Sequence, residues 1–288
     1  MGKNTIAVKF SWETKGLKPA DLEKSSLCLE LGNDFLNYAI FSANKEPLIL
    51  KSLQSKQFGA IKSIDSFIEQ DELLAHTFQK VFISLQNVSY TLVPKAFYKE
   101  EEKDTFIRFN SGAKKDALVF ADDIKRIEAK LVYAIAPALK KSIDKHFPNH
   151  HTKAAVSLII ETALLEKGNP PAGRAGTEIA YLNFKKDSVD LVLCNEKPVF
   201  CNSFSVISPE DLLYFVLAAF EQNNFNPASA QLVVTGETET NSLWIKLLKK
   251  YIKHISFAVI DKQFKKPLEI PNMPAHYYFH LLNLIHCE

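Results

Sequence analysis

The sequence predicts an α/β protein of two lobes, because one pattern of strands and turns occurs twice, about half the chain apart. Each copy reads as a short apolar strand, a tight turn, a second strand, another turn and a third strand, and the copies cover residues 27–53 and 180–204. Aligned on one another, they match Asp34 with Asp187, Asn37 with Asp190, Pro47 with Pro198 and Ser52 with Ser203. A helix and a fourth strand are predicted to follow each meander.

The first half of the chain carries the first copy. Residues 1–24 are polar, contain Gly16 and Pro19, and are predicted to be an irregular lead-in. A helix is predicted at 60–75, because Ile61, Ile64, Phe67 and other apolar residues recur at helical spacing. Strands are expected at 27–31, 35–42, 48–54 and 80–85.

Residues 86–148 have no counterpart in the second copy and are therefore predicted to be an insertion. Pro94 and Pro137 suit the first turn of a helix, where the missing N–H costs nothing. The expected elements of the insertion are strands at 90–93, 117–120 and 130–136 and helices at about 94–109 and 137–147. A helix at about 152–166 closes the first half.

The stretch 169–176 is the clearest linker in the chain, because it combines adjacent prolines with two glycines. It carries Arg174 but lacks the strand and the lysine of a phosphate-binding loop. We therefore predict a first lobe at 1–168 that contains the insertion, and a second lobe at 177–288 that ends in a C-terminal helix. Strands of the second lobe are expected at 177–184, 188–194, 198–205, 231–235 and 256–260, and helices at about 208–220, 241–251 and 276–286.

Composition excludes several classes of protein. The 288 residues are 47% hydrophobic and 24% charged, as in an ordinary globular protein that can bury a core of two lobes. The formal net charge of +2 gives no electrostatic case for nucleic acid. No stretch reaches the roughly 18 apolar residues of a membrane helix, and the four cysteines are scattered without a CxxC pair. A cytoplasmic, reduced protein is the expectation.

The chain resembles the actin-like ATPase superfamily and, more narrowly, an uncharacterised bacterial family of unknown function within it. The resemblance is carried by the repeated meander, the insertion, the Thr235-Gly236 turn and the segments Ser84-Leu85-Gln86-Asn87, Tyr90-Thr91-Leu92-Val93-Pro94, Arg108-Phe109-Asn110 and Pro209-Glu210-Asp211-Leu212-Leu213-Tyr214. It implies a two-lobed fold of duplicated ribonuclease H-like halves. Distant relatives of similar plan include actin-like proteins of pilus assembly and type II secretion, some of which act mainly as docking scaffolds.

The resemblance also indicates where a nucleotide site would lie. ATPases of this superfamily place an Asp and following glycines at the first hairpin of each lobe, where backbone N–H groups approach phosphates and carboxylates organise Mg²⁺. The first hairpin here offers Glu30 and Gly32, the second offers Asp187, and the adenosine turn offers Gly236 in place of paired glycines. Only nine glycines occur in 288 residues, about half the usual frequency. The resemblance thus implies a vestigial site and no cofactor, with ATP and Mg²⁺ as the alternative.

Other candidate residues have simpler structural interpretations. Lys185 and Lys186 could meet a phosphate, but they are expected to be exposed hairpin lysines. His276 and His280 have the i, i+4 spacing of paired metal ligands, but the residues between them are aromatic, so we expect a docking helix. We identify no catalytic constellation and expect no metal site.

The lost glycines, and the lack of any carboxylate in the second hairpin before Asp187, favour a non-catalytic cytoplasmic scaffold or adaptor with a protein partner. The alternative is a divergent ATP-binding protein or ATPase that works through the vestigial residues. The insertion carries Phe97, Tyr98, Phe106 and Phe109 beside charged residues, which could form a surface for a partner. Packing of these aromatics onto their own lobe is the alternative.

Overall fold

The computed structural model describes residues 6–55, 63–111, 113–125, 127–167, 178–195, 197–259, 270, 273–274 and 276–286. The chain divides into two compact units. Unit 1 consists of 1–124, 128–157 and 281–288, and unit 2 of 125–127 and 158–280. The expected linker at 169–176 lies outside the described residues. Within the described part of the chain, no helix is long and apolar enough to cross a membrane.

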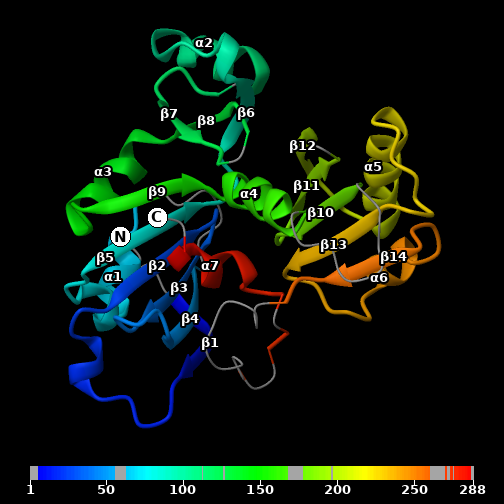
Figure 1. Ribbon diagram of the computed structural model, residues 1–288. Helices are drawn as coiled ribbons and strands as arrows, with labels where there is room; N and C mark the ends of the chain where they lie inside the picture. The colour runs from blue at the N-terminus through cyan, green and yellow to red at the C-terminus, as the bar shows by residue number, and fades with distance from the viewer. Residues whose placement is uncertain are drawn as a thin grey trace. The chain divides into compact units, whose positions relative to one another are not determined.

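Unit 1 is built on a six-stranded sheet with the order β1-β4-β3-β2-β5-β9 (Figure 1). Its strands are β1 (Ile6–Glu13), β2 (Ser26–Leu31), β3 (Phe35–Phe41), β4 (Pro47–Ser55), β5 (Lys80–Leu85) and β9 (His150–Ala154). The strands from β1 to β2 pair antiparallel, whereas β5 and β9 run parallel to β2. β2 is buried along its whole length, as expected of a central strand covered on both faces.

The insertion forms a separate small sheet in unit 1 with the order β6-β8-β7. Its elements are β6 (Ser89–Pro94), α2 (Lys103–Ser111), β7 (Leu118–Asp123) and β8 (Ala129–Ile135). Ile107 of α2 packs against Val93, Val119 and Val132 of the three strands in a core of its own. The remaining α-helices of unit 1 are α1 (Asp65–Gln70) and α3 (Pro137–His146), and the boundary between the units falls within α4 (Ala155–Lys167), after Ser157.

Unit 2 holds a five-stranded sheet with the order β12-β11-β10-β13-β14. The elements are β10 (Ile179–Phe184), β11 (Ser188–Cys194), β12 (Pro198–Ser205), α5 (Pro209–Gln222), β13 (Gln231–Gly236), α6 (Leu243–Leu248) and β14 (His254–Phe257). The boundary between the units falls within α7 (Phe279–Asn283), whose residues from Leu281 onward belong to unit 1. One face of the sheet packs with α5 and α6 residues such as Val216 and Ile245. The predicted start of α5 is confirmed, because Ser208 and Asp211 form a reciprocal capping box.

Several expected elements are corrected. The lead-in contains β1, which pairs with β4 because Ile6, Val8, Phe10 and Trp12 alternate with more polar residues. His150 and His151, which lie between the helices expected at about 137–147 and 152–166, belong to β9, which pairs with β5. Of the helix expected at 94–109, only the part from Lys103 onward is α-helical, as α2. The final α-helix begins at Phe279 instead of 276.

Candidate functional site

A row of buried polar side chains crosses four strands of the sheet in unit 1. Glu30 on β2 pairs in register with Asn37 on β3 and with Ser84 on β5, and Asn37 pairs with Ser52 on β4. All four residues are buried. Directly paired residues point to the same face of a sheet, so these side chains share one face.

Two side-chain amides hold the Glu30 carboxylate. Asn37 Nδ2 donates to Oε2 at 3.1 Å, and Gln86 Nε2 donates to Oε1 at 2.6 Å. Gln86 comes directly after β5, and its own backbone N–H donates to the carbonyl of Leu31 at 2.8 Å. The hairpin of β2 and β3 therefore provides one amide to the Glu30 carboxylate, that of Asn37, and the end of β5 provides a second, that of Gln86.

The sheet in unit 2 carries a row at the corresponding strand positions. Asn183 on β10 pairs with Asp190 on β11 and with Thr235 on β13, and Asp190 pairs with Ser203 on β12. Asn183 Nδ2 donates to Asp190 Oδ2 at 3.2 Å, and Thr235 Oγ1 donates to Asn183 Oδ1 at 3.1 Å. Compared with unit 1, the carboxylate and the amide have exchanged strands.

Lys185 is not an exposed hairpin lysine, contrary to the expectation. Its side chain is only 4% exposed, and Nζ lies 2.7 Å from Asp190 Oδ1, in a carboxylate that is itself 1% exposed. Ser203 Oγ donates to the same carboxylate oxygen. A buried charge is tolerated only when it is paired and hydrogen-bonded, so Lys185 and Asp190 require one another. The neighbouring Lys186 is exposed.

Two histidines occupy the interior of unit 2 near this row. His280 Nε2 lies 3.1 Å from Thr235 Oγ1, while His276 Nε2 donates to the carbonyl of Thr238 at 2.7 Å. Burial lowers the pKa of His280 to about 4, against the opposing influence of Asp190, and burial also lowers the pKa of His276. Both imidazoles are therefore neutral near pH 7. They bind separate partners, and no group of three potential metal ligands occurs among the described residues.

The Gly236 turn packs tightly against the start of the second hairpin. Gly236 has φ of +82°, and a Cβ there would lie 2.0 Å from the carbonyl oxygen of Phe184 and 2.7 Å from Asn183 Oδ1. The three successive N–H groups of the turn all donate within the unit: Gly236 to His276 O, Glu237 to Phe184 O and Thr238 to Gly236 O. Glycine is thus required by both the backbone conformation and the space.

The structure places the four predicted site residues in different surroundings. In unit 1, Glu30 belongs to the polar row, and Gly32 donates its N–H to the carbonyl of Phe35 at 3.1 Å to close the hairpin. In unit 2, Gly236 contacts Asn183 of the row, whereas Asp187 is exposed at the hairpin tip. Sequence reasoning did not single out Gln86, Thr235 or the Lys185–Asp190 pair as parts of the rows. A signal was present, because residues 30/37 and 183/190 share a spacing of seven across a hairpin.

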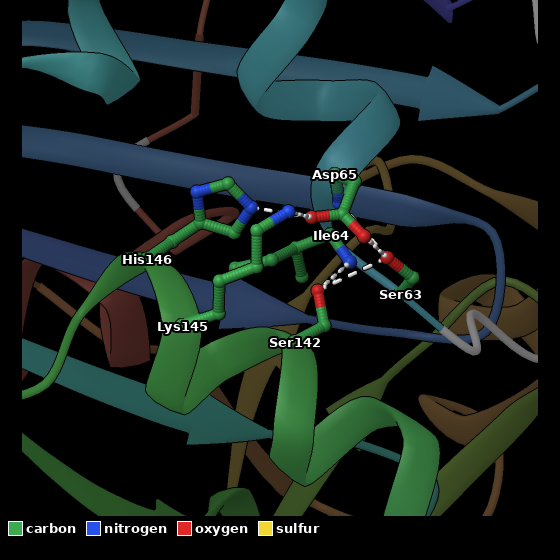
Figure 2. Close-up of polar contacts among 6 residues, drawn as sticks. All are labelled: Ser63, Ile64, Asp65, Ser142, Lys145 and His146. Carbon is green, nitrogen blue, oxygen red and sulfur yellow. Dashed lines mark hydrogen bonds and ion pairs between the residues drawn. The ribbon is translucent and has the colours of Figure 1, made fainter.

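Besides the two polar rows, a separate polar cluster in unit 1 joins the start of α1 to α3 (Figure 2). Ser142 Oγ accepts from the backbone N–H of Ile64 at 3.0 Å and lies 3.0 Å from Ser63 Oγ. The Asp65 carboxylate accepts from Ser63, from His146 and from Lys145, whose Nζ is 3.0 Å away. Hydrogen bonds from Ser63, His146 and Lys145 together hold the pKa of Asp65 well below its usual range. The cluster fastens α3, the last helix of the insertion, to the start of α1.

Comparison with solved structures identifies the fold as that of actin-like ATPases. A Bacteroides thetaiotaomicron VPI-5482 protein with actin-like ATPase fold and unknown function matches 94% of this chain and 99% of its own, at 17% identity and a TM-score of 0.73. A chain of the PilM–PilN type IV pilus biogenesis complex matches 91% of this chain and 98% of its own, at 12% identity and a TM-score of 0.57. These likenesses establish the fold.

The family follows from the sequence match. Residues 14–255 match the family described as protein of unknown function (DUF3822), so the chain belongs to that family. No curated protein matches the sequence. The expected resemblance to a family of unknown function with an actin-like fold is therefore confirmed.

Proposed function

We propose that this protein is a non-catalytic, cytoplasmic member of the actin-like ATPase fold, which serves as a scaffold or adaptor and retains only a degenerate nucleotide site. The observation that carries the proposal is the buried ion pair between Lys185 and Asp190 in the second hairpin. In ATPases of this fold, the same hairpin supplies a carboxylate for Mg²⁺ and glycines for the phosphates. Here it reads Asn183-Phe184-Lys185.

Charge argues against a metal–nucleotide at this hairpin. An amide at 183 offers Mg²⁺ no negative charge, and the carboxylate of Asp190 is already paired with an ammonium group and hydrogen-bonded to Ser203. Mg²⁺ binds through carboxylates and phosphates and demands near-ideal octahedral geometry. Recruiting Asp190 to the metal would leave Lys185 as a buried, unpaired cation, which is costly.

Backbone hydrogen bonding supports the same conclusion at the other candidate positions. A phosphate is held by N–H groups that point at the ligand. The N–H groups of Gly236, Glu237 and Thr238 are instead used within unit 2. Gly32 and Lys185 use theirs to close the two hairpins, with Phe35 and Ser188 as acceptors. The residues that would form the cradle do not fit the group.

We further infer that the two meanders descend from an internal duplication. Each polar row follows the same strand positions, and each carries one carboxylate facing one amide across the hairpin. The pairing of the second and third meander strands shifts register at the same point in both units, immediately before Phe41↔Pro47 and before Cys194↔Pro198. Irregular strand pairing of this kind is usually kept within a protein family, so its presence at the same point in both meanders supports a common origin.

A nucleotide-binding measurement tests the proposal. We expect ATP with Mg²⁺ to leave the melting temperature unchanged, whereas a ligand at a hundredfold its dissociation constant would add roughly 2.7 kcal/mol of stability. A shift of several degrees that disappears in Glu30→Ala, but persists in the matched surface variant Glu101→Ala, would overturn the scaffold function. It would support the alternative, a divergent ATP-binding protein that uses Glu30, Asp187 and Gly236.

The insertion supports a role in binding a protein partner. Tyr98 and Phe106 pack against the small core of the insertion, whereas Phe97 is 71% exposed and Phe109 is 88% exposed. Exposed aromatic side chains beside charges are typical of interaction surfaces. We expect Phe97→Ala with Phe109→Ala to abolish co-purification of a partner at unchanged melting temperature. Tyr98→Ala is the contrasting variant, because it removes a packed side chain and lowers stability.

A further inference from the structure

We propose that unit 2 docks on a membrane surface rich in anionic lipid, through a basic face at the end of α6. The basic face consists of the four exposed lysines Lys246, Lys249, Lys250 and Lys253. No acidic residue occurs between Glu239 and Asp261, so these lysines are not balanced by acids in their own stretch of sequence. The docking extends the proposed scaffold function, which rests on the nucleotide site and is tested separately with ATP.

Backbone hydrogen bonds continue the helical turn of α6 and fix which side chains face outward. The N–H of Ile252 donates to the carbonyl of Leu248 at 2.9 Å, four residues back. One side of this turn is buried in the core of unit 2, through Ile245, Leu248 and Ile252. Residues three or four apart share a side of a helix, and the outward side carries Leu243, Lys246 and Lys250.

The lysines of the basic face differ from the helix lysines of unit 1, which pair with acids. Lys103 beside α2 pairs with Glu100, and Lys140 of α3 pairs with Asp144. Within the described part of the chain, no carboxylate forms an ion pair with a lysine of the basic face. Like charges three or four residues apart destabilise a helix. Patterns that work against local stability are expected mainly at functional sites, so the basic face calls for an anionic ligand.

Exposed apolar side chains accompany the basic face. Leu243 is 72% exposed and Tyr251 is 54% exposed. Surfaces that lie on membranes combine lysines with leucine and aromatic residues, because the apolar groups enter the boundary of headgroups and acyl chains while the ammonium groups stay at the headgroups. The cytoplasmic leaflet is anionic, and each lysine near it strengthens binding by about fivefold. Four lysines therefore contribute on the order of several hundredfold.

The choice of cation favours a lipid surface over a nucleic acid or an acidic protein. All cations of the basic face are lysines, and the described residues of unit 2 contain no arginine. Arginine is preferred where phosphates or carboxylates are bound in a fixed, two-pronged geometry, whereas lysine acts as a point charge on a flexible stem. A fluid surface of negative headgroups needs only point charges. Leu243 also has an acyl boundary to enter, whereas nucleic-acid bases stack on aromatic rings.

Vesicle sedimentation of the full chain tests the proposal. The chain should bind phosphatidylcholine vesicles that contain about 30% phosphatidylserine, should not bind pure phosphatidylcholine, and should bind more weakly as salt is added. Lys249→Glu with Lys250→Glu should weaken binding by at least about twentyfold at unchanged melting temperature. The matched control is Lys114→Glu with Lys115→Glu, an adjacent exposed pair in the insertion with the same change in net charge. Its binding should stay within about twofold of wild type.

A fluorescent probe tests whether the apolar side chains reach the bilayer. Tyr251→Trp should be quenched by vesicles with brominated acyl chains beyond the quenching seen in wild type, whereas Lys115→Trp should not. A wild-type chain that ignores anionic vesicles would overturn the proposal, as would equal losses in the two lysine pairs or an unquenched Tyr251→Trp. Polyglutamate or single-stranded RNA that binds as tightly as the vesicles would also overturn it, in favour of an acidic protein or a nucleic acid.

Discussion

The polar rows of the two units lie at the same strand positions but hold their buried carboxylates differently. In unit 1 the carboxylate is on the first meander strand, where Glu30 accepts from the amides of Asn37 and Gln86. In unit 2 it is on the second strand, where Asp190 is held by the ammonium group of Lys185. The exchange keeps a carboxylate facing an amide across the hairpin, but it moves the negative charge from the first meander strand to the second. The lysine occupies the hairpin position that Gly32 holds in unit 1, because both residues donate their backbone N–H to close their hairpins.

The largest effect is expected from breaking the ion pair of unit 2. Lys185→Met leaves the Asp190 carboxylate as a buried, uncompensated charge, so the free energy of unfolding should fall by about 3–5 kcal/mol. Urea denaturation measures the change. Lys186→Met is the matched control, because that side chain is exposed and its loss should change stability by less than about 0.5 kcal/mol.

The double variant Lys185→Met with Asp190→Asn sharpens this result. Removing both charges eliminates the unpaired carboxylate, so a large part of the lost stability should return. A single variant as stable as wild type would mean that Lys185 does not neutralise Asp190, and the contrast between the two rows would then disappear.

A second prediction compares the glycines beside the two rows. Gly236→Ala should cost about 3 kcal/mol, because φ is +82° and the added Cβ meets the backbone oxygen of Phe184. Gly32→Ala should cost about 1 kcal/mol, because the three atoms nearest to its new Cβ all belong to the ring of Phe35, which can rotate away. Thermal unfolding of the two variants gives the comparison. Equal losses would show that the hairpin of unit 1 is as constrained as the turn of unit 2.

The fold could be predicted from the sequence where side-chain pattern alone decides the structure. The six meander strands combine apolar alternation with turn residues, and all six form within two residues of their predicted bounds. β9 could not be found in this way, because its residues His150–Ala154 are largely polar and become a strand only through pairing with β5. β1 carried an alternating signal that the polar composition of residues 1–24 obscured.

The candidate site was less predictable, because it depends on register. Glu30 could be named from its place at the end of a strand, but Gln86 reaches it only because β5 lies parallel to β2. Lys185 lies two residues beyond Asn183 on the same face of its hairpin, so Asp190 on the facing strand determines its burial. Sequence distance alone gave no reason to pair residues 185 and 190.

A third prediction contrasts Asp190 with Asp122, a buried aspartate of unit 1 whose donors are neutral. The Asp122 carboxylate accepts from Ala154 N at 2.9 Å and from Ser157 Oγ at 2.6 Å. Burial raises its pKa to about 6, against the hydrogen bonds from Ser157 and Ala154. The folded chain thus binds this proton more tightly than the unfolded chain, so the contribution is present below about pH 4 and is lost as the pH rises through 6.

Asp122→Asn should remove that pH dependence. Between pH 4 and 7, the stability of wild type relative to the variant should fall by on the order of 2 kcal/mol, because only wild type must ionise a buried carboxyl. Urea denaturation at several pH values measures both chains. Parallel curves across this range would contradict the raised pKa of Asp122.

The smallest effect is expected at the cluster that joins α1 to α3 in unit 1. Hydrogen bonds from Ser63, His146 and Lys145 lower the pKa of Asp65, so the charged form stabilises the folded chain above about pH 4, and this contribution is lost as the pH falls further. The Asp65 side chain is 38% exposed, so solvent screens the interaction, and Asp65→Asn should cost less than about 1 kcal/mol at pH 7. The difference from wild type should shrink with added salt. It should also shrink as the pH falls below about 4 toward the lowered pKa of the folded state, because the carboxylate then becomes protonated. Hydrogen exchange should locate the loss in α3, because Asp65 anchors His146 and Lys145 at the end of that helix, whereas protection of α5 in unit 2 should be unchanged. A loss of several kcal/mol, or one that grows as the pH falls, would show that Asp65 stabilises the fold by packing instead of by its charge.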